Sequence, residues 1–226
     1  MTRDAYGTGE DGTDKDRIDK DQIDKDGIGK DRLLAFADAV TAIAITLLAL
    51  EIRVPEGLDA GQLGHALGET LVKVYAYLLS FTVVGLLWLA HHRLFSLMVA
   101  VDRATVRLEL ALLAVIAALP FPTRLLSEYG GTTEATAGYA AAIALTAALL
   151  TVMTLRLRAS GPPRIGEASP RRVARLLYAN ATLTAVFATS IPVALASPTA
   201  AKYWWGLLVP LRILPRWVRR WRRIPD

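Results

Sequence analysis

The residue with the clearest chemical potential is Asp38, a carboxylate close to the start of a long apolar stretch. Residues 33–54 have the length and apolarity of a membrane-spanning helix. A carboxylate at membrane depth costs about 2.5–3.5 kcal/mol on insertion scales, so it usually faces protein or water. Asp38 is therefore a candidate site. It could bind a permeating cation or organise the surrounding helices, and its position away from the main apolar stripe favours the second role.

That apolar stripe is the second feature of the same segment. At about 100° per residue, one face of the predicted helix carries three bulky aliphatic residues and a hydroxyl, extended by an aromatic ring. These residues are Ile43, Thr46, Leu47, Leu50 and Phe36. The stripe could simply face lipid, or it could line a pore as a hydrophobic constriction. Periodicity alone leaves both interpretations open.

A separate face of this helix carries small residues together with Asp38. Ala35, Ala42 and Ala49 recur every seven residues beside it. Small side chains let another helix approach closely in a membrane. We therefore expect this face to pack on a neighbouring helix and Asp38 to bond there.

The other polar residues of the apolar segments suggest no enzyme. Adjacent helical residues point about 100° apart, so His91 and His92 do not form a metal site by themselves, and no nearby acid completes one. We expect Glu109 to pair with an arginine, for example Arg107. No catalytic residue and no metal ligand is predicted.

Composition indicates an integral membrane protein. Hydrophobic residues make up 53% of the 226 residues, and the mean hydropathy is +0.35. There is no cysteine, which excludes disulfides and thiolate chemistry. The net charge of +5 comes from basic residues clustered beside apolar segments, which fits a membrane surface and not nucleic acid.

The apolar pattern predicts six transmembrane helices and three regions. The expected spans are residues 33–54, 71–95, 106–126 (interrupted by Pro120 and Pro122), 135–157, 173–196 (bent at Pro192) and 200–214. Residues 56–68 are expected to be a loop. Residues 1–31, with their Asp-Lys-Asp repeats, read as a disordered charged tail, residues 32–214 as the membrane domain and residues 215–226 as a basic tail.

Loop charges predict the orientation. Arginines concentrate between the fourth and fifth spans, in the loop after the second span and in the C-terminal tail, and these segments alternate with loops poor in basic residues. By the positive-inside rule, both termini are cytoplasmic in a multi-pass protein of the cell membrane.

Three blocks of sequence resemble the transmembrane protein 175 family of potassium channels. The first is Arg32, Phe36 and Asp38, followed by AIAITLLALEIRVP over residues 42–55. The others are WLAHHRLF at residues 88–95 and LPFPTRLL at residues 119–126. Ala37 replaces the serine that is typical of the family motif.

The resemblance implies an all-helical homotetramer with the first helices around a central pore for potassium ions, and no cofactor. Its constriction maps onto Ile43, Leu47 and Leu50, with Thr46 near the path. Arg32, Phe36 and Asp38 would hold the cytoplasmic end of the pore helix, supported by Trp88, His91 and His92. By the same analogy, one histidine would bond near Arg32 or Asp38. The alternative is a secondary or proton-coupled transporter that uses Asp38 as a relay.

Overall fold

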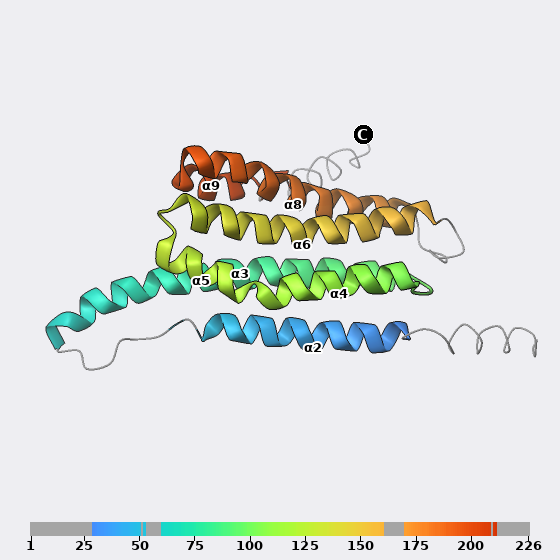
Figure 1. Cartoon of the computed structure of the whole chain (residues 1–226), viewed down its shortest axis with the longest axis horizontal. Coiled ribbons are helices and arrows are strands. Elements are labelled where there is room, and N and C mark those ends of the chain that lie inside the picture. The colour runs from blue at the N-terminus through green and yellow to red at the C-terminus, as the bar shows by residue number, and fades with distance from the viewer. Residues whose placement is uncertain (1–28, 51, 53–59, 161–169, 209, 212–226) are drawn as a thin grey trace, which may run out of the picture.

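The chain folds into a set of long helices that run along one common axis (Figure 1). The computed structural model describes residues 29–50, 52, 60–160, 170–208 and 210–211. Within these ranges every regular element is helical. The all-helical class expected from the sequence is therefore confirmed. Residues 1–28 of the predicted N-terminal tail and the basic C-terminal tail lie outside the described residues, whereas Lys30 and Asp31, which were assigned to the disordered tail, already belong to the helix that starts at Lys30.

Five stretches of the described residues are long and apolar enough to cross a membrane. They comprise six helices, because one stretch is divided in two. The elements are α2 (Lys30–Ala49), α3 (Ala60–Ser96), α4 (Arg103–Ala118), α5 (Pro120–Tyr129), α6 (Thr133–Ala159) and α8 (Pro170–Ala196), followed by the short α9 (Pro198–Trp205).

Two expectations about the spans need adjustment. The predicted loop at residues 56–68 is wrong over its second half, because α3 is already helical from Ala60. Residues 60–96 contain no proline to interrupt the helix, and none of Gly61, Gly64 and Gly68 has the positive φ that a turn would require. The predicted sixth span is not confirmed. Its described residues form α9 and a short continuation, and the rest lies outside the described ranges.

The division between α4 and α5 follows from proline chemistry, as the sequence predicted. Pro120 has no backbone N–H, so it cannot continue the hydrogen-bond ladder of α4. The last amide before it, that of Leu119, turns to the Ile116 carbonyl three residues back. Pro120 then occupies the first position of α5, where a missing donor costs nothing.

The end of α8 is covered by α9, which begins after the Ser197 cap. Pro192 lies inside α8, and the helix continues through it to Ala196. The indole of Trp205 donates to Ser190 Oγ at 2.9 Å, and its ring stacks on Phe187 at 5.4 Å. Both partners belong to α8, so α9 folds back on the helix that precedes it.

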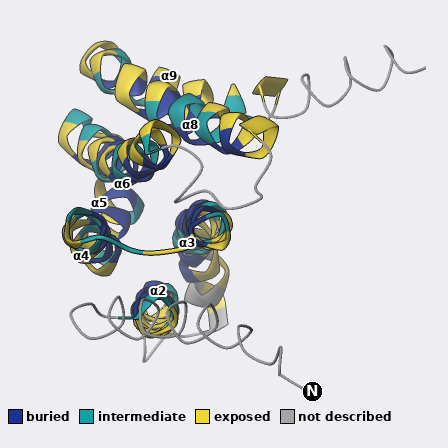
Figure 2. Ribbon diagram, turned by 90° about the vertical axis from the view of Figure 1, so that its right-hand side faces the viewer, coloured by how far each residue is buried: buried dark blue, intermediate teal, exposed yellow. Residues whose placement is uncertain are grey.

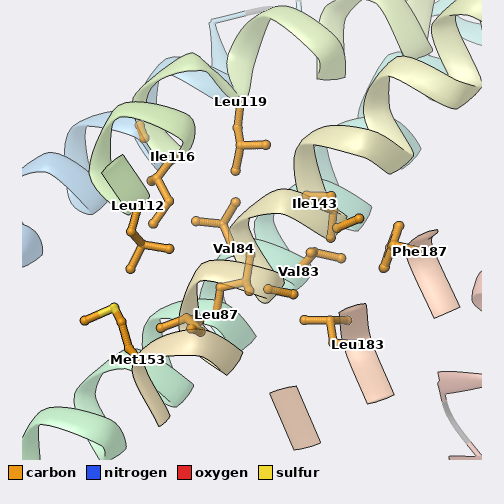
Figure 3. Packing of buried hydrophobic residues seen from close by; sticks show 14 of the residues in the cluster. Val83, Val84, Leu87, Leu112, Ile116, Leu119, Ile143, Met153, Leu183 and Phe187 are labelled. Atoms are coloured by element: carbon orange, nitrogen blue, oxygen red, sulfur yellow. The ribbon is translucent and has the colours of Figure 1, made fainter. Parts of the chain in front are cut away.

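Seen end-on, the helices form successive layers, with α2 on one outer side, α3 and α4 next to it, and α6 and α8 beyond (Figure 2). The closest pairing is between α6 and α8, while α2 packs mainly on α3 and α4. Aliphatic side chains from α3, α4, α6 and α8 meet between the layers (Figure 3).

Hydroxyl groups join the layers where apolar packing alone would not fix them. Ser80 of α3 contacts the hydroxyls of Thr123 in α5 at 3.0 Å and Tyr139 in α6 at 3.2 Å. A second seam joins α6 to α8, through Thr151 with Thr184 and Thr154 with Asn180. Such contacts between polar side chains help to fix the register of neighbouring helices in lipid.

The face of α2 that packs on the rest of the subunit is narrow, and most of its residues are small. Its buried residues follow a helical spacing of four, four, three and four: Leu33, Ala37, Thr41, Ala44 and Leu48. Ala35, Ala42 and Ala49 are exposed, so the alanine face expected to pack is not the one buried within the subunit. Small residues occur on both faces of α2, and their size alone does not choose between them.

Replacing Ala37 by leucine is expected to destabilise the subunit. Ala37 is 1% exposed, and extra methylenes in a filled contact usually cost about 1–3 kcal/mol. The melting temperature of the detergent-solubilised protein should fall for Ala37→Leu and stay close to wild type for Ala141→Leu, at an exposed site of α6. Equal melting temperatures for both variants would contradict this packing.

Candidate functional site

The bulky stripe of α2 lies on the outside of the subunit. Ile43 is 60% exposed, Leu47 41% and Leu50 62%, and Thr46 and Phe36 are also exposed. The Thr46 hydroxyl donates to the Ile43 carbonyl of its own helix at 2.8 Å. These side chains therefore do not belong to the core of the subunit. Their surface is available to another copy of the chain or to lipid.

Asp38 faces the opposite way and is bound by α3. The indole Nε1 of Trp88 donates to Asp38 Oδ1 at 2.7 Å. The bond joins residues fifty positions apart, and both side chains are partly buried. An ionised acceptor strengthens such a bond. The expectation that Asp38 bonds to a neighbouring helix is met, with Trp88 as its partner.

One turn of α3 connects this contact to a second, buried one. His91 lies three residues after Trp88, and its Nε2 atom is 2.9 Å from Glu109 Oε1 of α4. The two atoms are not aligned for a hydrogen bond, and both Glu109 oxygens lack a hydrogen-bond partner among the described residues. Glu109 is completely buried, so its carboxyl group depends on His91 for polar contact.

This arrangement corrects two expectations. Glu109 contacts a histidine of α3 and not Arg107, which is exposed on its own helix. The histidine that is buried binds toward α4 and not toward Arg32 or Asp38. An acid inside an apolar span can be recognised in the sequence as a residue that needs a polar partner, and Glu109 is such an acid. Which residue becomes its partner depends on how the helices are arranged.

The remaining predicted residues surround these contacts at the surface. The His92 ring lies 5.7 Å from that of Trp88, and His92 is exposed. Arg32 is exposed near the start of α2. The structure thus brings together Asp38, Trp88 and His92, directs His91 toward Glu109 of α4, and leaves Arg32 and Phe36 exposed on α2.

Lys30 is a residue that the sequence did not single out. Its Nζ donates to the Met98 carbonyl at 2.8 Å, which ties the first turn of α2 to the connection between α3 and α4. Asp102 caps α4 in the same connection by accepting from the Thr105 amide at 2.8 Å. The start of α2 is therefore held at two levels, by Lys30 and, two turns deeper, by Asp38.

Comparison with known proteins finds relatives of the part of the chain that contains these contacts. Residues 32–120 match a family model described as the endosomal/lysosomal potassium channel TMEM175. We call residues 32–120, which are similar to this family, the TMEM175-like region. The region begins just before Asp38 and includes the stripe of α2, Trp88, His91 and Glu109.

Similar proteins carry the same family name or the name of a potassium channel. One, named a potassium channel, from Streptomyces collinus, is 50% identical over 98 residues, covering 43% of this chain and 48% of the relative. Another of that name, from Chamaesiphon minutus, is 42% identical over 102 residues, covering 43% and 49%. The matched TMEM175-type stretch thus spans about half the length of these relatives.

The likeness extends further in the fold than in the sequence. A crystal structure described as a lysosomal potassium-selective channel TMEM175 homolog from Chamaesiphon minutus superposes with a TM-score of 0.70 at 26% identity. The match covers 81% of this chain and 96% of that one. The helices beyond the TMEM175-like region therefore share the arrangement of that structure as well.

Removing the indole donor from the TMEM175-like region is expected to loosen the attachment of α2 to α3. Trp88→Phe keeps the ring and removes the bond to Asp38, and bonds between membrane helices are worth about 0.6–2 kcal/mol. The melting temperature should fall more than for Trp204→Phe, which removes an indole bond to Thr189 at an exposed site. Equal losses would show that the contact with Asp38 has no special weight.

The buried contact of His91 with Glu109 is expected to behave as a coupled pair. Breaking a buried pair from one side typically costs about 3–5 kcal/mol, because a charge is left without its partner. His91→Leu and Glu109→Leu should each destabilise strongly, and the double variant should lose less than the sum. Unfolding free energies measure the coupling, and additivity within about 0.5 kcal/mol would contradict it.

Proposed function

We propose that this chain forms a potassium-permeable cation channel of the cell membrane, a homotetramer in which four α2 helices surround the pore. The names of the similar potassium channels and the fold shared with the TMEM175 homolog support the proposal. Both termini would be cytoplasmic, which requires residues 200–214 to complete a sixth crossing. The positive-inside distribution of arginine supports this orientation.

The observation that carries the proposal is the exposed row of Ile43, Leu47 and Leu50 on α2. A helix at the edge of the subunit, fixed on one face and bulky on the other, can pack its free face against copies of itself around an axis. The aliphatic side chains of the four copies would then form rings around that axis, and such a constriction controls conduction by excluding water. Potassium sheds its hydration shell more easily than smaller cations, which a narrow apolar neck would exploit.

Thr46 supplies the polar group that such a neck needs. Its hydroxyl donates a hydrogen bond to the Ile43 carbonyl, so a lone pair of the hydroxyl oxygen is left to coordinate a permeating cation. Thr46 lies between Ile43 and Leu50 along the helix, inside the proposed constriction. Oxygen ligands suit alkali cations, and no resident cofactor is needed.

The alternative, a coupled transporter with Asp38 as proton relay, has less support. Asp38 already accepts the Trp88 indole and lies on the face of α2 turned away from Leu47. A carboxylate in this position is suited to holding the helix. Reversal potentials distinguish the two functions, because a channel follows the potassium gradient alone, while a coupled carrier also follows its second ion.

Purified protein in planar bilayers, with potassium on one side and sodium on the other, tests the proposal. Leu47→Ser is expected to raise the current and to bring the permeabilities of the two ions closer, because a hydroxyl admits water to the neck. The matched control is Leu145→Ser, at a leucine of α6 that is 51% exposed.

The control should conduct as the wild type does, since α6 lies away from the proposed axis. Unchanged currents for Leu47→Ser would argue against an α2 constriction. An equal increase for both leucine variants would show a general effect of polar substitutions on the surface.

A further inference from the structure

The two helices farthest from α2 end in exposed arginines on the same side of the bundle. The last turn of α6 carries Arg156 and Arg158, and the start of α8 carries Arg171, Arg172 and Arg175. The first turn of α8 has no acid. Because α6 and α8 pack together along their length, these ends are neighbours, at the right-hand end of the molecule in Figure 1.

Four of these arginines have no acidic partner among the described residues. Arg156 is the exception, since it lies 3.5 Å from Asp102. Arg158, Arg171, Arg172 and Arg175 are all exposed. Within the part of the chain that the structure describes, no acid neutralises these four guanidinium groups. Like charges on adjacent helix ends repel one another, so a ligand with negative charge would stabilise them.

Each of the two helices places an exposed apolar side chain one turn below an arginine. On α6, Leu155 lies three residues before Arg158 and is 46% exposed. On α8, Arg171, Arg175 and Tyr178 are spaced by four and three residues, so they share one face, and Tyr178 is 49% exposed. The order along both helices is charge at the end and then apolar surface, which is the order of a phospholipid headgroup and its acyl chains.

We propose that Arg158, Arg171, Arg172 and Arg175 bind the headgroup of an anionic phospholipid in the leaflet at this end of the bundle. Guanidinium groups pair with phosphate through two parallel hydrogen bonds. The apolar surface directly below the charges favours a lipid over a soluble anion or a nucleic acid. The inference depends on the chain being in a membrane and not on which ion it conducts.

Titration of the detergent-solubilised full chain with two lipids tests the proposal. Phosphatidylglycerol should raise the melting temperature progressively, while phosphatidylcholine with the same acyl chains should not, because only a lipid that prefers the folded state stabilises it. Inorganic phosphate is the third ligand. Stabilisation by phosphate alone, equal to that by phosphatidylglycerol, would identify a site for soluble anions and overturn the proposal.

Matched triple variants locate the surface. R171Q/R172Q/R175Q is expected to lose most of the shift caused by phosphatidylglycerol, and R158Q part of it. R93Q/R103Q/R107Q removes the same charge from exposed sites of α3 and α4 and should keep the shift. Equal loss in both triples would mean unspecific attraction and would overturn the assignment.

Charge-conserving and single variants cover a failure to fold. R171K/R172K/R175K retains the charge and should retain part of the shift. If the glutamine triple cannot be purified, R171Q and R175Q alone should each lessen the shift, and a full shift in both would contradict the proposal.

Discussion

The hydrogen bond between Trp88 and Asp38 determines how α2 is turned, and the outer surface of the subunit depends on it. A helix in lipid gains little from hiding one apolar face over another, so its rotation is chosen by close packing and polar contacts. After its first, charged turn α2 is apolar almost all round, and Asp38 is the one carboxylate from Leu33 onward. At about 100° per residue, Leu47 stands about 180° from Asp38. Once the indole holds Asp38 against α3, the leucine side must point away from the subunit.

The end of the bundle at which α2 begins is held by different contacts from the opposite end. Lys30, Asp38 and the contact between His91 and Glu109 are all polar, and they link α2, α3 and α4 near the ends where Lys30 begins α2 and Ser96 ends α3. Toward its other end, α2 is held by apolar residues such as Ala44 and Leu48. A helix fixed by directional bonds at one end and by packing at the other has a defined rotation throughout, because one rigid rod cannot turn at one end alone.

Hydropathy was sufficient to predict most of the fold. Five of the predicted spans correspond to helices, and the break at Pro120 followed from the missing N–H of proline. The early start of α3 was missed because glycines at 61, 64 and 68 resemble a loop in composition.

The candidate site could be predicted only in part. A carboxylate in a span must find a partner, so the bond of Asp38 was expected, but the identity of the partner depends on which helices are neighbours. For the same reason Glu109 was assigned to Arg107, whereas the structure supplies His91 from α3. The buried face of α2 was misjudged since Ala37 and Ala44 are as small as the alanines of the exposed face.

The same reasoning explains why sequence similarity is concentrated in residues 32–120 while the fold is shared over 81% of the chain. In the first region helices are joined by pairs such as Trp88 with Asp38, in which neither partner can be replaced without leaving a polar group alone in an apolar setting. Between α6 and α8 the polar contacts are made by threonines and Asn180, and threonine can also satisfy its hydroxyl on its own helix, as Thr154 does with the Leu150 carbonyl. Many sequences can meet that requirement, so the arrangement of these helices can persist while their residues differ.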